Sequence, residues 1–136
     1  MNVPSAPALL AARRLWARDG TAPRTATELA EDAHRVTGEV RRRLVRWIGS
    51  EGYQLLLQRA LAQTRTGYPV LAGVTCDGGE LRGLPETMQA HEVPEVADGI
   101  EALFATLIDR LGRVVGPELA ERLVAPAPET EGARDG

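Results

Sequence analysis

A short pattern that occurs twice constrains the fold of this chain more than any other feature. Residues 43–51 read Arg-Leu-Val-Arg-Trp-Ile-Gly-Ser-Glu and residues 110–118 read Arg-Leu-Gly-Arg-Val-Val-Gly-Pro-Glu, which gives five identities in nine positions. In both places apolar residues recur at helical spacing over a long stretch that ends at a glycine, and a shorter stretch with the same spacing follows. A chain rich in Leu, Arg and Ala also produces short matches by chance, so duplication and chance both stay open. Either way, the sequence predicts two helix–glycine–helix units.

The first unit has a well-defined start. Thr25 and Glu28 have the spacing of a capping box, in which each side chain accepts a hydrogen bond from a backbone N–H of the first helical turn. Apolar residues then recur at steps of three and four, as expected for one face of a helix; they are Leu29, Ala33, Val36, Val40, Leu44 and Trp47. The second unit has a similar stripe, made of Ile100, Leu103, Phe104, Leu107, Ile108, Leu111, Val114 and Val115.

The two glycines are interpreted as structural corners. Gly49 and Gly116 follow the long stripes, where a residue with positive φ can end a helix as a left-handed cap. Glu51 and Glu118 then lie in the first turn of the next helix, where a carboxylate interacts favourably with the helix dipole. A paired binding feature is the alternative interpretation of the same residues.

These elements predict an all-α fold: a helical bundle of about five helices, with a pseudo-twofold internal repeat as an open question. Two long antiparallel helices, each followed by a shorter helix after its glycine corner, should pair along their apolar faces. Residues 1–124 form the predicted single domain, with half-repeats at 25–66 and 94–124. Residues 125–136 are predicted to be a flexible tail, and the connection 75–93 is long for a compact helical domain.

Composition excludes several classes of protein. The single cysteine, Cys76, cannot form an internal disulfide or a cysteine-rich metal site. No signal peptide is apparent, and no apolar run approaches the roughly 18 residues of a membrane span, so we expect a cytoplasmic protein without membrane contact. All sixteen basic residues are arginines, which is typical of a GC-rich bacterial genome.

Few residues suggest catalysis. His34, Cys76 and His91 are the residues suited to imidazole or thiol chemistry, but no local signature places a base beside the thiol. Acidic residues of the 75–98 region are interpreted as an exposed loop. We therefore expect no catalytic residues, no metal site, no cofactor and no enzymatic activity.

Charge is distributed unevenly along the chain. Residues 1–65 contain eleven arginines against six acidic residues, whereas residues 66–136 contain five arginines against thirteen, although the whole chain has a net charge of −3. The two halves could complement each other, subunits could associate, or the first half could bind an acidic partner. Arg35, Arg42 and Arg46 share one side of the first long helix and are the candidate partner-binding residues. The competing interpretation is a solvated face with ion pairs from Glu31 to Arg35 and from Glu39 to Arg42 and Arg43.

Together these observations favour a non-enzymatic protein–protein interaction module, a small bacterial adaptor or regulatory subunit that acts through a helical face. Its partner would be a protein, acidic or encoded nearby, and surplus apolar surface could be buried in a homodimer. One alternative is a nucleic-acid-associated regulator using the arginine-rich helix, which the acidic overall charge disfavours. The other is a small-ligand sensor whose pocket is closed by residues 75–93.

Overall fold

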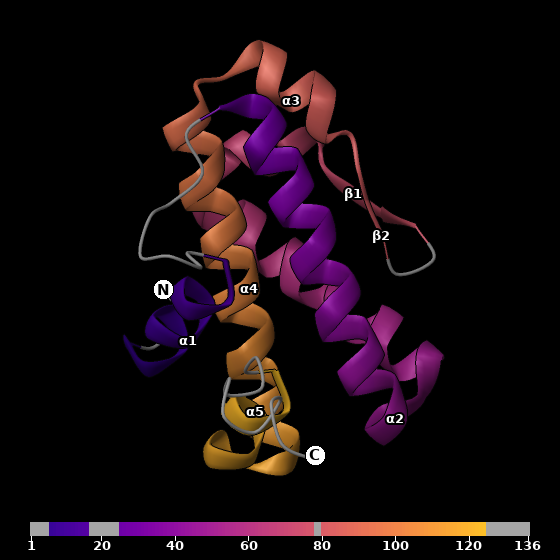
Figure 1. Ribbon diagram of the computed structural model, residues 1–136. Coiled ribbons are helices and arrows are strands. Elements are labelled where there is room, and N and C mark those ends of the chain that lie inside the picture. The colour runs from indigo at the N-terminus through magenta and orange to yellow at the C-terminus, as the bar shows by residue number, and fades with distance from the viewer. Residues whose placement is uncertain (1–5, 17–24, 78–79, 125–136) are drawn as a thin grey trace, which may run out of the picture.

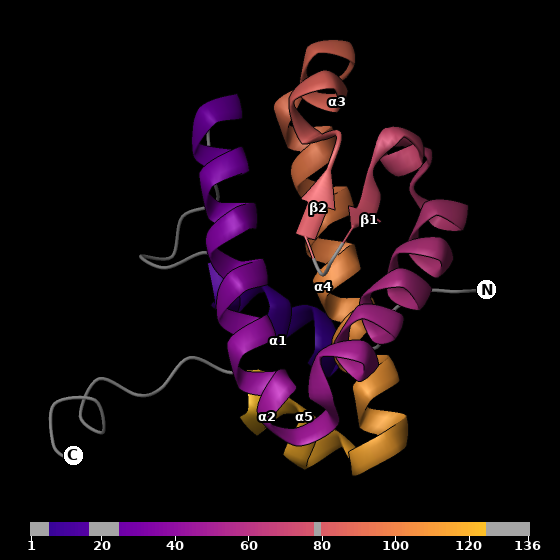
Figure 2. The same ribbon diagram turned by 90° about the vertical axis from the view of Figure 1, so that its right-hand side faces the viewer.

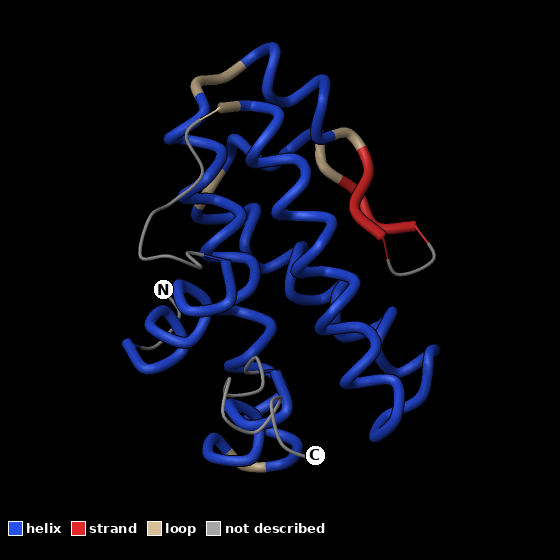
Figure 3. Tube along the Cα trace, viewed as in Figure 1, coloured by secondary structure: helices blue, strands red, loops and turns tan. Residues whose placement is uncertain are grey.

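The computed structural model describes residues 6–16, 25–77 and 80–124 of the 136-residue chain. Among these, helices predominate and the strands form one short hairpin (Figure 3). The elements in chain order are α1 (Ala6–Trp16), α2 (Ala26–Gly67), a 3-10 helix η1 (Pro69–Gly73), β1 (Thr75–Asp77), β2 (Glu80–Arg82), α3 (Leu84–Ala90), α4 (Val93–Val115) and α5 (Pro117–Val124). The predicted all-α class therefore holds broadly, with a small antiparallel sheet in addition. The expected tail, 125–136, lies outside the described residues.

The start of α2 confirms the predicted capping box. The backbone N–H of Glu28 donates to the Thr25 hydroxyl at 3.0 Å, and the N–H of Thr25 donates to the Glu28 carboxylate at 3.3 Å. Two of the backbone donors that a helix start leaves without a partner are thus satisfied by side chains.

Gly49 divides α2 into a first segment, residues 26–48, and a second segment, residues 50–67. Its backbone has φ 80° and ψ 166°, and Gly116, between α4 and α5, has φ 98° and ψ 144°. Positive φ is confirmed at both corners, but the large ψ differs from the expected left-handed cap and belongs to a region that side chains with a Cβ rarely occupy. The shared conformation agrees with the repeated sequence, while the duplication itself stays a prediction.

The central element is α4. Every side chain from residue 102 to residue 108 is buried, so the helix is covered on all sides rather than along one stripe. Alanines and a threonine between the leucines (Ala102, Ala105 and Thr106) let neighbouring helices approach closely. Gly99 has the same effect near the start of α4, because a Cβ there would lie 3.1 Å from side-chain atoms of Val70 and Leu71 in η1.

The two segments of α2 join at Gly49, and both pack against α4 (Figures 1 and 2). The first segment buries Leu29, Val36 and Leu44, three residues of the predicted apolar stripe. Tyr53 of the second segment is buried, and its hydroxyl donates to the carbonyl oxygen of Thr37 in the first segment at 3.4 Å. Burial raises the pKa of Tyr53, which favours the protonated form that donates this hydrogen bond.

The direction of the long helices differs from the expectation. The first segment of α2 and α4 both begin at the end of the molecule where α3 lies and both run toward the end with the glycine corners (Figures 1 and 2). They are parallel. The second segment of α2 runs back in the opposite direction (Figures 1 and 2) and is a neighbour of α4, since its Gln63 contacts Arg110. Apolar stripes specify which faces are buried but are equally compatible with either direction.

The connection between the helical units is folded. Strands β1 and β2 pair in antiparallel register, with Cys76 opposite Leu81, and Leu81 and Leu84 are buried. In the view of Figure 2 this hairpin lies across the face between the two segments of α2. Within the described part of this connection, buried leucines attach the segment to the bundle.

Two residues of the predicted stripes are exposed. Trp47 is 60% exposed and Val114 is 73% exposed, each in the last turn before a glycine corner. In α1 the buried side chains include Ala8, Ala11 and Ala12, whereas Leu10 is 54% exposed. One ion pair between the two halves of the chain, Arg13 to Glu101 at 3.0 Å, joins α1 to α4.

Candidate functional site

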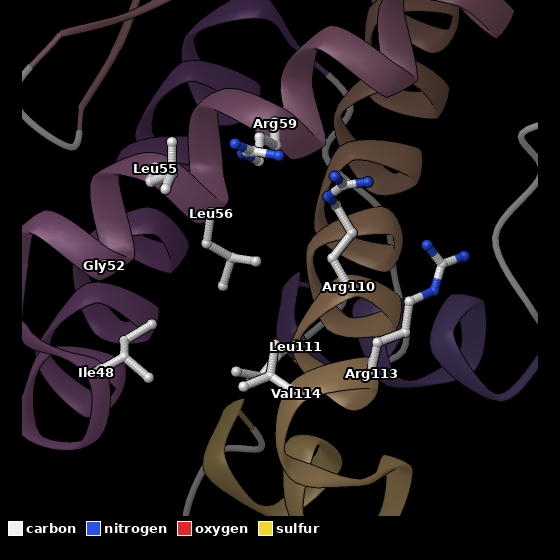
Figure 4. Close-up of a pocket in the computed structure, with 9 residues that line it drawn as sticks. All are labelled: Ile48, Gly52, Leu55, Leu56, Arg59, Arg110, Leu111, Arg113 and Val114. Atoms are coloured by element: carbon white, nitrogen blue, oxygen red, sulfur yellow. The ribbon is translucent and has the colours of Figure 1, made fainter.

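A pocket of about 420 Å³ lies near the glycine corners, between the carboxyl end of α4 and the part of α2 that begins at Ile48 and continues into its second segment (Figure 4). Both helices contribute a continuous face to it, since the residues from each recur at helical spacing. The lining residues are Ile48, Gly52, Leu55, Leu56 and Arg59 from α2, and Arg110, Leu111, Arg113 and Val114 from α4.

The body of the pocket is apolar. Figure 4 shows the side chains of Leu56, Leu111 and Val114 facing a common space that Ile48 borders on the opposite side. Gly52 supports this arrangement, because a Cβ at that position would lie 3.2 Å from the Cβ of Ile48. The pocket therefore offers aliphatic carbon to whatever enters it.

Much of this apolar surface is open to solvent. Leu55 is 49% exposed and Val114 is 73% exposed, and Trp47, which precedes the lining residue Ile48, is 60% exposed. Single exposed hydrophobic residues are ordinary on protein surfaces, but several large ones around one pocket are typical of an interaction site. Three of the four most exposed large hydrophobic side chains among the described residues are found in this region, and the fourth is Leu10.

Arginines supply the polar part of the pocket. The guanidinium groups of Arg59 and Arg110 lie at the same end of the apolar space (Figure 4). Arg110 is held in place by a hydrogen bond from Nη1 to Oε1 of Gln63 at 2.7 Å. Arg113 points away from Leu56, along the other side of α4 (Figure 4). The charged side chains of the lining are all arginines, so the groups that face the pocket favour an anionic ligand over a cationic one.

The three arginines singled out from the sequence are not part of this pocket. Arg35 is half-buried and pairs with Asp32 at 3.1 Å and with Glu39 at 3.9 Å, rather than with Glu31. Arg42 and Arg46 are exposed. The structure thus separates the predicted set: Arg35 belongs to an ion-pair network on its own helix, whereas Arg42 and Arg46 face solvent.

The predicted structural corners lie at the end of the molecule that carries the pocket. Gly49 follows the lining residue Ile48, and Gly116 lies two residues after Val114. Glu51 and Glu118 are exposed in the first turns of the following helices, where the sequence placed them. The corners therefore turn the chain immediately beside the pocket.

The described part of the 75–93 connection, residues 75–77 and 80–93, contributes nothing to the lining of this pocket. The ligand-sensor hypothesis expects residues 75–93 to close its ligand pocket, and the described part of that segment does not close this one. Within the segment, Cys76 is half-buried, and burial raises the pKa of its thiol to about 11. His91 is exposed, with Nδ1 3.6 Å from the Glu95 carboxylate. No cluster of His, Cys, Asp or Glu suited to a metal ion occurs within the described residues.

Sequence reasoning did not identify the arginines of the pocket as a site. Arg110 and Arg113 were noticed only as part of the repeated pattern, and Arg59 was not singled out. The available signal was Leu55, an apolar residue outside the buried stripe of its helix and one turn before Arg59. Such a pairing of an exposed leucine with an arginine is weak evidence until a second helix is known to lie beside it.

Comparisons with protein families, with curated proteins and with solved structures find no match to this chain. Within the part of the chain that the structure describes, no helix combines the length and the apolar character needed to cross a membrane.

Proposed function

We propose that this protein is a non-enzymatic interaction module, a small adaptor or regulatory subunit that binds another protein through the surface at its glycine corners. The observation that carries the proposal is the apolar pocket with exposed Leu55 and Val114 around it. An apolar centre bordered by arginines has the composition of many protein interfaces, in which a few buried anchors contribute most of the binding energy.

The energetic argument follows from the exposed area. Complete burial of a leucine or valine side chain that was exposed contributes about 1.5–3 kcal/mol, and Leu55, Val114 and Trp47 all have such area to lose. In the free protein much of this contribution is unused, because the described part of the chain covers these side chains only in part.

Arg42 and Arg46 offer a rival surface for the same function. Both are exposed on one side of the first segment of α2, so an acidic partner could bind there instead. We favour the pocket because Leu55 and Val114, two of the most exposed large hydrophobic side chains among the described residues, line it, whereas Arg42 and Arg46 lie outside its lining.

The proposal is tested with the purified chain as an affinity bait in extract from cells that naturally make it. Leu55→Asp and Val114→Asp place a charge in the exposed apolar surface, and Leu10→Asp makes the same change at an exposed leucine on α1 that does not line the pocket. We expect the recovered protein to be lost with the first two variants and retained with the third. Equal recovery with all variants, or none above an unrelated bait, contradicts the proposal.

A further inference from the structure

We propose that the occupant of the pocket is an amphipathic helix of a partner protein, with acidic residues at one end of its apolar stripe. This inference rests on the proposed interaction function and adds the chemistry of the partner to it.

The shape of the pocket suits a helix. Its walls are two antiparallel helical segments, and the α2 wall extends from Gly52 to Arg59, about 10 Å at 1.5 Å per residue. That is two helical turns. A third helix that lies between the two walls would present two or three apolar side chains at spacings of three and four, as in other helix-in-groove complexes.

The charges of the pocket indicate at which end of that helix its acidic residues should lie. Arg59 and Arg110 lie at one end, and Ile48 and Val114 lie toward the other (Figure 4). Guanidinium groups bind carboxylates with strong, directed hydrogen bonds. Because Gln63 already holds Arg110, part of the ordering cost of binding is absent at that side chain. The acidic residues of the partner should therefore lie beside Arg59 and Arg110.

Three other occupants fit less well. A second copy of this chain that presented the same surface would bring its own Arg59 and Arg110 to the pocket, and its exposed Glu51 and Glu118 lie outside the lining. Residues 125–136 contain Glu129, Glu131 and Asp135 but no apolar side chain larger than proline, so they cannot fill the aliphatic space. A small anionic amphiphile would match the pocket but would leave Trp47, whose side chain is 60% exposed outside the lining, uncovered.

The test is a selection from a displayed library of helical peptides with randomised surface positions, performed on the full chain. We expect selected peptides to share an apolar stripe with Asp or Glu at one end. Selection on Val114→Asp should yield no enrichment of that pattern. Peptides enriched without acidic residues would overturn the inference and leave the interaction module standing.

A charge exchange locates the contact. In fluorescence anisotropy titrations, Arg59→Glu should weaken binding of a selected acidic peptide by about tenfold, since a hydrogen bond to a charged group is lost and a repulsion is added. A peptide with lysine in place of the acidic residues should regain affinity for the same variant. Arg42→Glu is the matched control, because this arginine is exposed on α2 but does not line the pocket. If Arg42→Glu weakens binding and Arg59→Glu does not, the contact is at the rival surface.

Two further arms separate the remaining occupants. If oleate binds saturably but reduces peptide binding less than the Val114→Asp substitution does, the result agrees with a helix site. Oleate binding in the absence of any selected peptide contradicts it. A mass by light scattering that doubles with concentration for the wild type but not for Val114→Asp shows a second copy in the pocket and overturns the inference. Failure of the interaction function itself has a different signature, namely no selected peptide and no protein recovered from extract.

Discussion

The glycine corners allow a stability prediction whose size follows from backbone geometry alone. A Cβ added at Gly49 or Gly116 would meet no atom within 4 Å, so alanine at either position has space for its methyl group. Both residues nevertheless have φ near +90° and a large ψ, a region in which a residue with a Cβ costs about 1–3 kcal/mol. Any loss of stability on substitution therefore measures backbone strain and not a side-chain clash.

Gly49→Ala should lower the free energy of unfolding by about 1–2 kcal/mol. This net loss is smaller than the backbone strain, because alanine also reduces the entropy of the unfolded chain, which stabilises the folded state by about 0.4–1 kcal/mol. With an unfolding entropy of about 2.1 cal/mol/K per residue, a 136-residue chain should then melt about 3–7 °C lower. Gly116→Ala should lose a similar amount, since its φ and ψ are close to those of Gly49.

Gly67→Ala is the matched control. Gly67 also has no atom within 4 Å of an added Cβ, but its φ lies outside the left-handed region, and it belongs to the last turn of α2. We expect this variant to be as stable as the wild type or slightly more stable. Thermal and urea unfolding followed by circular dichroism measure all three variants. Equal melting temperatures for Gly49→Ala and Gly67→Ala would refute the argument from backbone strain.

Three other predictions concern separate parts of the fold. Gly83→Ala should destabilise more than Gly49→Ala in urea unfolding, because a Cβ at this positive-φ residue would lie 2.3 Å from the carbonyl oxygen of Gly73; equal losses would contradict this. Thr25→Ala should lose about 0.5–2 kcal/mol with the capping box, and Thr25→Ser should restore most of it in the same assay. The raised pKa of Cys76, about 11 against an ordinary 9.0, leaves on the order of a hundredfold less thiolate at pH 8, so iodoacetamide should alkylate the folded chain far more slowly than the urea-unfolded chain. Because the folded pKa is raised, the stability linked to this thiol is present below the unfolded pKa and is lost as the pH rises through about 11. Cys76→Ser should lose less stability than the wild type over this range, and the loss that remains includes the contribution of Tyr53, whose pKa is also raised.

Local features of the fold could be predicted because neighbouring residues determine them. The capping box at Thr25 acts within one helical turn, and the glycine corners require a backbone conformation that the residues around them cannot supply. The buried stripes were also predicted well, down to Leu44 and Leu111. The β1–β2 hairpin was missed, because two strands of three residues are too short to show an alternating pattern.

The candidate site could not be predicted in the same way. Arg35, Arg42 and Arg46 are conspicuous because they cluster in sequence, whereas Arg59 and Arg110 are about fifty residues apart and meet only when α4 packs beside α2. Val114 has the spacing of a core residue, but it lies beyond the part of α4 that other helices cover. A periodic pattern gives the side of a helix that is apolar, and it does not give the length over which a neighbour covers that side.

Local interactions set where α2 begins and where the chain turns at Gly49 and Gly116, because hydrogen bonds and φ angles are settled among residues a few positions apart. Long-range packing decided the rest: α4 packs against both segments of α2 and against α1 and α5, and it runs parallel to the first segment and antiparallel to the second. Apolar burial depends on area and has no direction, so the same stripes could have been buried in several arrangements. The arrangement that formed leaves Leu55 and Val114 uncovered beside two arginines, and the proposed partner site depends on that outcome.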